Sequence, residues 1–117
     1  MCAYLRIDQI LVESAILVVS AEVIPGKDEE FDKWYNEHHI PEYSGKMPYL
    51  KSVKRYYSKR SNPQYIAIYE YDSYDNLKKS MASKESNLAG EDADKQVGVL
   101  VKSFTFNTYS MNFSHVS

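Results

Sequence analysis

His38 and His39 are adjacent imidazoles, and Tyr35 lies four residues before the second of them. An imidazole has an unperturbed pKa of about 6.5, so near neutral pH it can take a proton from a substrate and return it. Side chains four residues apart are neighbours on a helix, so we expect Tyr35 to lie beside His39. We therefore select His39 as the candidate acid-base catalyst, with Tyr35 next to it.

Both histidines also have structural interpretations. The helix dipole favours a histidine at a helix C-terminus whatever its function, so His39 can instead close the helix and pack on Tyr35. His38 is either a second pocket residue or a core histidine. Adjacent helical residues point about 100 degrees apart, so these two side chains are poorly placed to chelate one metal ion. We predict no metal site.

One predicted helix over residues 28–39 carries these side chains. Asp28 is the expected N-cap, and the acidic residues after it suit the positive end of the helix dipole. Pro41 disfavours helical backbone at the residue before it, so the helix should end near His39. The side chains at the spacing of one helical face are Phe31, Trp34, Tyr35 and His38. They should pack on a sheet, with Trp34 lining a ligand cavity as the alternative.

The remaining elements alternate between strand and helix patterns. Apolar and β-branched residues predict strands over 14–24, 50–59, 64–72 and 97–113. Ser73 is the expected N-cap of a second amphipathic helix that ends close to Gly90, and the charged segment 91–96 is expected to be a loop. The order is βαββαβ. This predicts an α+β, ferredoxin-like domain whose four-stranded antiparallel sheet has two helices on one face.

The aromatic residues of the strands predict an interface or a ligand pocket on one face of the sheet. In strand 64–72, Tyr65, Tyr69 and Tyr71 share one face, opposite Ile66 and Ile68. Two helices cover only one face of the sheet, so we expect the aromatic face to meet a second copy of the chain in a homodimer. The same aromatic surface suits a small-molecule pocket, and its expected substrate contacts are Trp34, His38, Tyr69, Tyr71 and Tyr109. Glu70 needs a partner, and the sequence does not decide which sheet face it occupies.

Three segments resemble a known family. Residues 34–41 read Trp-Tyr-Asn-Glu-His-His-Ile-Pro, followed by Met-Pro-Tyr-Leu at 47–50 and Tyr-Ile-Ala-Ile-Tyr-Glu at 65–70. This pattern resembles the EthD-type branch of the dimeric α/β-barrel superfamily. The resemblance implies a ferredoxin-like protomer that pairs into a barrel, and it matches the family histidine to His39. His38 stands where such sequences often carry Glu or another polar residue.

Two functions from different classes follow. The resemblance implies a cofactor-free enzyme that moves protons on a small aromatic or polyketide-like compound, by cyclisation, dehydration, isomerisation or oxygenation. His39 would be the acid-base group, with Tyr35 and Tyr69 orienting a hydroxyl or enolate oxygen. The alternative is a non-catalytic dimeric protein that binds a small aromatic or apolar ligand in the same cavity. A cavity that holds His39 within hydrogen-bond reach favours the enzyme, and a sealed apolar core favours the binding protein.

Composition sets the broad class. The chain has 117 residues, which fits one domain over 14–113, with an extension over 1–13 and a tail over 114–117. The formal net charge of −2 argues against nucleic-acid and anionic-membrane surfaces. One cysteine, no long apolar run and no export signal predict a cytoplasmic protein. No glycine-rich phosphate loop or Ser/His/Asp nucleophile motif is present, so we expect no nucleotide cofactor. The apolar extension is either an added strand or docked arm, or a disordered end.

Overall fold

The computed structural model describes residues 13–117, and the expectations for the N-terminal extension lie almost entirely outside them. The strands are β1 (Ala15–Val23), β2 (Leu50–Tyr57), β3 (Tyr65–Tyr71) and β4 (Val101–Ser110). The first helical region comprises α2 (Asp28–Trp34), the π-helical turn η1 (Tyr35–His39), α3 (Ile40–Glu42) and the 3₁₀ turn η2 (Ser44–Lys46). The second comprises α4 (Tyr74–Met81) and α5 (Lys84–Asp94).

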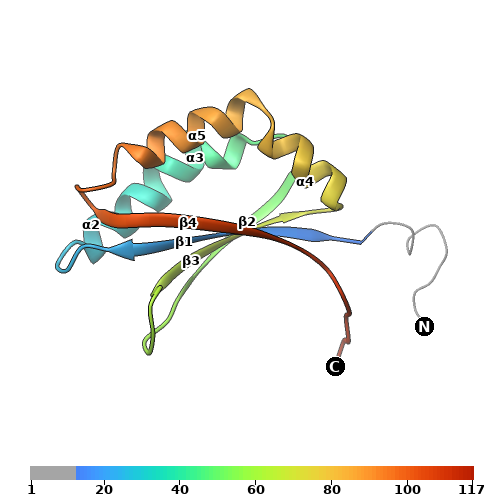
Figure 1. Cartoon of the computed structure of the whole chain (residues 1–117), viewed down its shortest axis with the longest axis horizontal. Helices are drawn as coiled ribbons and strands as arrows, with labels where there is room; N and C mark the ends of the chain where they lie inside the picture. Colours follow the sequence, from blue (N-terminus) through green and yellow to red (C-terminus); the bar gives the residue numbers. More distant parts are fainter. Residues whose placement is uncertain (1–12) are drawn as a thin grey trace.

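The four strands form one antiparallel sheet in the order β2-β3-β1-β4. The central strands β1 and β3 pair with each other, and β2 and β4 lie at the edges. Both helical regions lie on the same side of the sheet (Figure 1). The predicted ferredoxin-like α+β fold is therefore confirmed.

The first helical region continues further than the sequence predicts. Lys27 is the N-cap and makes no side-chain capping bond, so the expected cap at Asp28 is wrong. The helix also passes Pro41 and ends at Glu42, and the Tyr43 amide donates to the His39 carbonyl at 2.9 Å. A proline ring clashes with the carbonyl of the preceding turn in a regular α-helix. Here the wider π turn ends at His39, two residues before Pro41, and the irregular turn lets the helix continue past the ring.

The second helical region is two helices rather than one. Ser73 caps α4 as expected by accepting a hydrogen bond from the Asn76 amide, and Ser83 caps α5 by accepting one from the Ser86 amide. Helix α5 runs to Asp94, so the predicted loop over 91–96 is wrong. The last strand begins only at Val101, because residues 97–100 fold into turns on the Gln96 carbonyl. Asp92 lies in this additional part of α5 and is buried.

The aromatic face of β3 points towards the helices. Tyr65, Tyr69 and Tyr71 are 7%, 1% and 0% exposed and belong to the main core. The expectation that this face meets a partner sheet is therefore wrong, because the helices already cover it.

The face without helices carries a different set of residues. Ile66, Ile68 and Glu70 lie there, and Glu70 accepts a hydrogen bond from the Ser52 hydroxyl at 3.0 Å. Tyr109 pairs in register with Ile16 and shares that face. Any second copy that covers the sheet must do so on this side.

Candidate functional site

The π turn decides which histidine enters the protein. The Ile40 amide bonds to the Tyr35 carbonyl, five residues back, so this turn holds one residue more than an α-helical turn. The buried face consequently moves from His38 to His39. His39 is 5% exposed and stacks on Trp34 with 4.6 Å between ring centroids, whereas the His38 side chain is 39% exposed. The expectation that His38 shares the Phe31 and Trp34 face is wrong.

His39 is paired with a buried carboxylate from the opposite helix. Its Nδ1 lies 2.8 Å from Oδ2 of Asp92, and both side chains are 6% exposed. A carboxylate only accepts hydrogen bonds, so Nδ1 carries the hydrogen and donates it to Asp92. Within residues 13–117, Nε2 of His39 makes no hydrogen bond. The imidazole therefore holds Nε2 free to accept a proton.

Burial sets the protonation state of His39. Loss of solvent lowers the pKa of His39 below its usual value, and the Asp92 carboxylate opposes this without reversing it. The ring is therefore neutral near pH 7. A neutral imidazole fixed by a carboxylate at Nδ1 is the form that acts as a general base.

His38 occupies the rim of the same cluster. Its Nε2 lies 3.2 Å from Oδ1 of Asp92, and its Nδ1 lies 3.1 Å from Oε2 of Glu42. The hydrogen bond to Asp92 is the main cause that raises the pKa of His38. The two histidines thus share one carboxylate, and their pKa values shift in opposite directions.

A chain of buried hydroxyls runs beside His39. The Tyr69 hydroxyl donates to Oγ of Ser44 at 2.9 Å and lies 2.7 Å from the Tyr35 hydroxyl. Tyr69 thereby uses its only hydrogen on Ser44, so Tyr35 is the donor in their shared bond. Burial raises the pKa of both tyrosines, which keeps them as neutral phenols. The Tyr35 hydroxyl hydrogen is used on Tyr69, and the Tyr69 hydroxyl hydrogen is used on Ser44. These two bonds hold the Tyr35 ring in place against the His39 ring.

Within the described residues, Trp34 contributes a second polar atom without a hydrogen bond, and this one is fully buried. Among the side chains of residues 13–117, Nε1 of Trp34 is the buried polar atom without a hydrogen bond. An unpaired buried N–H is costly, and in native proteins it often marks the place of a water or ligand. The indole ring that carries it is stacked on the His39 ring.

The predicted site residues are only partly brought together. His39, Tyr35, Trp34 and Tyr69 form one cluster, with His38 at its rim. Tyr71 is buried on the same sheet face but bonds to Ser80 at 2.8 Å. Tyr109 is 49% exposed on the opposite face, which separates it from the cluster.

Three residues of this region are missing from the sequence predictions. Asp92 follows buried Ala89 by three residues, a helical spacing that could have revealed it. Ser44 gave no signal, because its role depends on the fold. Arg55 was not selected because a basic side chain on an edge strand is usually exposed, yet the Arg55 side chain is only 15% exposed.

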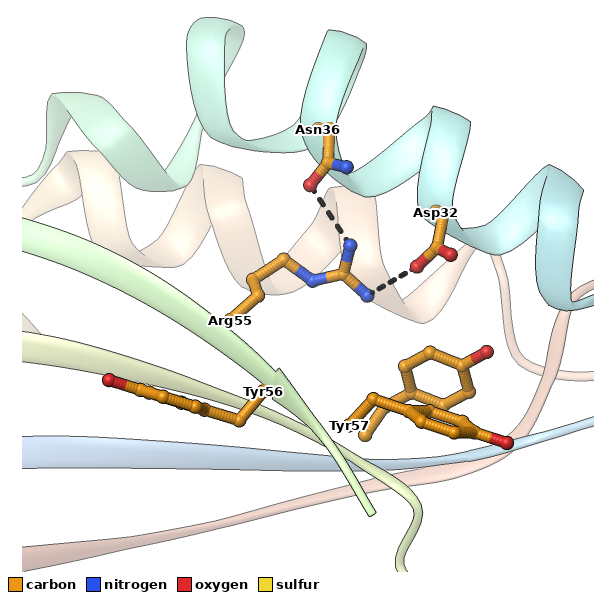
Figure 2. A pocket seen from close by; sticks show the side chains of 6 residues that line it. Asp32, Asn36, Arg55, Tyr56 and Tyr57 are labelled. Carbon is orange, nitrogen blue, oxygen red and sulfur yellow. Dashed lines mark hydrogen bonds and ion pairs between the residues drawn. The ribbon is translucent and has the colours of Figure 1, made fainter. Parts of the chain in front are cut away.

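Two of the surface pockets on the described part of the chain lie beside the first helical region, and neither of these two is lined by His39. One lies between α2 and the edge of β2, around Arg55, and has a volume of about 470 Å³ (Figure 2). The other lies on the outer surface of the first helical region, among acidic side chains. The expected cavity around His39 is therefore not among them.

The described residues contain neither a metal-ligand group nor a membrane-spanning helix. Among residues 13–117, no three acidic, histidine or cysteine side chains form a metal-ligand group. None of the helices in that range has the length and apolarity needed to cross a bilayer.

Fold and cluster together define a small ferredoxin-like α+β protein with a buried His-Asp pair. No protein-family model matches the sequence, and no curated protein sequence matches it either. An EthD family protein from Bacillus halodurans c-125 aligns with a TM-score of 0.60 and 22% identity, over 81% of this chain and 96% of that one. The expected likeness to EthD-like proteins is thereby confirmed at the level of the fold.

Other solved structures share the fold at lower identity. The cofactor-independent oxygenase SnoaB from Streptomyces nogalater, in a mutant form, has a TM-score of 0.62 and 11% identity, over 86% of this chain and 95% of that one. A dimeric protein of unknown function with a ferredoxin-like fold, from Bacteroides fragilis NCTC 9343, has a TM-score of 0.55 and 14% identity, over 84% and 96%. At these identities the likeness shows the fold alone.

Proposed function

We propose that this protein is a small cofactor-independent enzyme that transfers protons on a small aromatic or polyketide-like compound. The observation that carries the proposal is the 2.8 Å bond between Nδ1 of His39 and Asp92, with both side chains buried. The pair fixes the ring orientation and the tautomer of His39. A lone helix-closing histidine would not need a buried carboxylate from a different helix.

In this mechanism, Nε2 of His39 takes a proton from the substrate and forms an imidazolium that Asp92 stabilises. The proton then returns to another atom of the substrate, so the enzyme ends unchanged. The electrons left by the proton collect on a substrate oxygen as an enolate or phenolate. The unpaired N–H of Trp34 is the donor available to such an oxygen, because the hydroxyls of Tyr35 and Tyr69 are already engaged. Tyr35 acts as a positioning residue whose ring packs on His39.

The structural neighbours fit this class without identifying a reaction. SnoaB is a cofactor-independent oxygenase on the same fold. Folds host many unrelated reactions, so the proposal for this chain rests on its own residues.

A non-catalytic binding protein is the second candidate. The observation that favours it is that neither pocket is lined by His39. In that case the His-Asp pair ties α5 to the first helical region, and the open pockets provide the binding surface.

We also propose that the protein is a homodimer. The sheet face without helices presents Ile16, Val18, Ile66 and Ile68, which a second copy would cover. The ferredoxin-like neighbour from Bacteroides fragilis is described as dimeric. The chemistry at His39 lies on the other side of the sheet, so it does not depend on this interface.

Deuterium exchange tests the enzyme proposal without a known reaction. Enolisable aromatic ketones are incubated with the protein in D₂O, and loss of their acidic C–H signal is followed by proton NMR. We expect His39→Gln to lower the exchange rate by at least about 100-fold, the usual scale of acid-base catalysis. His115→Gln, the same change in the exposed tail, is the matched control.

The outcomes separate the two functions. A folded His39→Gln variant that exchanges a compound as fast as the unchanged protein would exclude His39 as the catalyst. A variant that no longer folds would show that the histidine is structural, as the binding-protein candidate requires.

A further inference from the structure

The pocket beside β2 has the features of a ligand site and is separate from the His39 cluster. Its lining residues are Asp32, Asn36, Arg55, Tyr56, Tyr57 and Tyr65. Its volume of about 470 Å³ falls within the range of small-molecule sites. The Tyr35 ring lies between the two regions, because it contacts Arg55 on one side and His39 on the other.

Arg55 forms the fixed inner wall of this pocket. One terminal nitrogen donates to the Asn36 side-chain oxygen at 2.9 Å, and the other lies 3.0 Å from a carboxylate oxygen of Asp32, as the dashed lines in Figure 2 mark. The guanidinium carbon also lies 4.6 Å from the ring centroid of Tyr35 and 5.7 Å from that of Tyr65. A guanidinium has five N–H groups. The contacts to Asn36 and Asp32 therefore hold it in place and leave donors for a ligand.

Aromatic rings form the opposite side. Figure 2 shows the Tyr57 ring below the guanidinium of Arg55. The rings of Tyr57 and Tyr65 lie 4.8 Å apart at 59°, and the Tyr65 hydroxyl donates to Asp28 at 2.6 Å, which fixes its ring. Tyr57 is 50% exposed, so part of its ring is free to contact an aromatic ligand.

The charges of the pocket select the ligand. Arg55 and Asp32 carry opposite charges and meet at 3.0 Å, so the lining has no net charge. An anion that approached Arg55 would meet the Asp32 carboxylate, and a cation that approached Asp32 would meet the guanidinium. A phenolic hydroxyl satisfies both, because its oxygen accepts from Arg55 and its hydrogen is donated to Asp32.

We propose that this pocket binds neutral hydroxylated aromatic compounds, with the hydroxyl held between Arg55 and Asp32 and the ring on Tyr57. The proposal does not depend on catalysis by His39, since the pocket contains none of the residues of that cluster. It gives the protein a second ligand site, whether or not the first one turns over a substrate.

Three probes of similar shape test the charge argument: phenol, benzoate and benzylamine. Each is titrated into the full-length protein, and the ring signals of Tyr57 and Tyr65 are followed by NMR. A ligand this small binds in about the millimolar range. We expect saturable shifts with phenol, and binding at least about tenfold weaker for the two charged probes.

A charge change in the pocket should reverse the preference. Asp32→Asn leaves Arg55 without its counter-charge, so benzoate should then bind at least about tenfold more tightly than it does to the unchanged protein. Glu29→Gln removes the same charge from the same helix outside this pocket and is the matched control. Arg55→Lys keeps the positive charge but loses the planar guanidinium with its several N–H donors, so it should weaken phenol binding by about tenfold.

Three results would overturn the proposal. The first is equal binding of the three probes, and the second is the absence of any saturable shift with phenol. The third is a benzoate affinity that responds equally to Asp32→Asn and Glu29→Gln. If Arg55→Lys does not fold, the Asp32→Asn result decides alone, because Asp32 is half exposed on the helix surface.

Discussion

Replacing Tyr69 by phenylalanine removes one hydroxyl that takes part in two buried hydrogen bonds. That hydroxyl lies 2.7 Å from the Tyr35 hydroxyl and 2.9 Å from Oγ of Ser44. The ring of Tyr69 is 1% exposed, so water cannot replace the missing group without opening the core. The substitution leaves two buried polar groups short of a partner.

The expected loss follows from the number of bonds. A typical hydrogen bond contributes about 1 kcal/mol net, and a buried group left without a partner costs about 1–3 kcal/mol. Tyr69→Phe should therefore lower the unfolding free energy by about 2–4 kcal/mol. Tyr71→Phe is the matched control, because that ring is 0% exposed and its hydroxyl makes one bond, to Ser80. Its expected loss is about half as large.

Urea unfolding at one fixed protein concentration measures both values. Fixing the concentration matters, since association would otherwise shift the apparent stability. With a slope of about 2 kcal/mol per molar urea, Tyr69→Phe should move the midpoint by about 1–2 M. A loss for Tyr69→Phe no larger than that for Tyr71→Phe would refute the hydroxyl chain and, with it, the support of the Tyr35 ring beside His39.

Three further changes test the assembly and the backbone. If the protein is the proposed homodimer, Ile68→Lys on the uncovered sheet face should convert it into a 13.6 kDa monomer in light scattering; an unchanged protein that is already monomeric would contradict the proposal. Gly45→Ala should lower the unfolding free energy by about 1–3 kcal/mol, because its Cβ would lie 2.5 Å from the Ile40 carbonyl oxygen; an unchanged urea midpoint would contradict this. Removal of residues 1–13 should cost less than about 2 kcal/mol by the same assay, and a larger loss would place that segment in the core.

The fold could be predicted from the sequence because its signals are local. The strand patterns, Ser73 as a helix cap and the alternation along β3 each correspond to an element of the structure. The side of the sheet that the helices cover could not be predicted in this way. Both faces carry apolar side chains, so the helix connections decide which one is buried.

The site was harder to predict because it depends on a departure from regular geometry. The expectation for His38 assumed an α-helical period, whereas the π turn over Tyr35–His39 moved the buried position to His39. Asp92 was overlooked because the polar segment around it resembles a loop, although Ala89 and Asp92 are its inward positions. The pairing of His39 with Asp92 depends on how two helices that are distant in the sequence pack together, and no local sequence pattern reveals that packing.

The charge state of His39 also makes a prediction about pH. The folded protein binds a proton on His39 less readily than the unfolded chain, whose histidines titrate at about 6.5. The contribution of His39 to stability is therefore present above about pH 6.5 and is lost as the pH falls below it. His38 has the opposite sign, because its pKa is raised, so its contribution is present below about pH 6.5 and is lost as the pH rises through its folded-state pKa.

The most direct test of the His-Asp pair is nitrogen-15 NMR of the imidazole rings across a pH titration of the full-length protein. We predict that His39 at pH 7 is the neutral tautomer with hydrogen on Nδ1 and a free Nε2, and that it titrates below the ordinary histidine range while His38 titrates above it. An imidazole at position 39 that titrates at or above the ordinary histidine value of about 6.5, or that carries its hydrogen on Nε2 at pH 7, would contradict the proposed base.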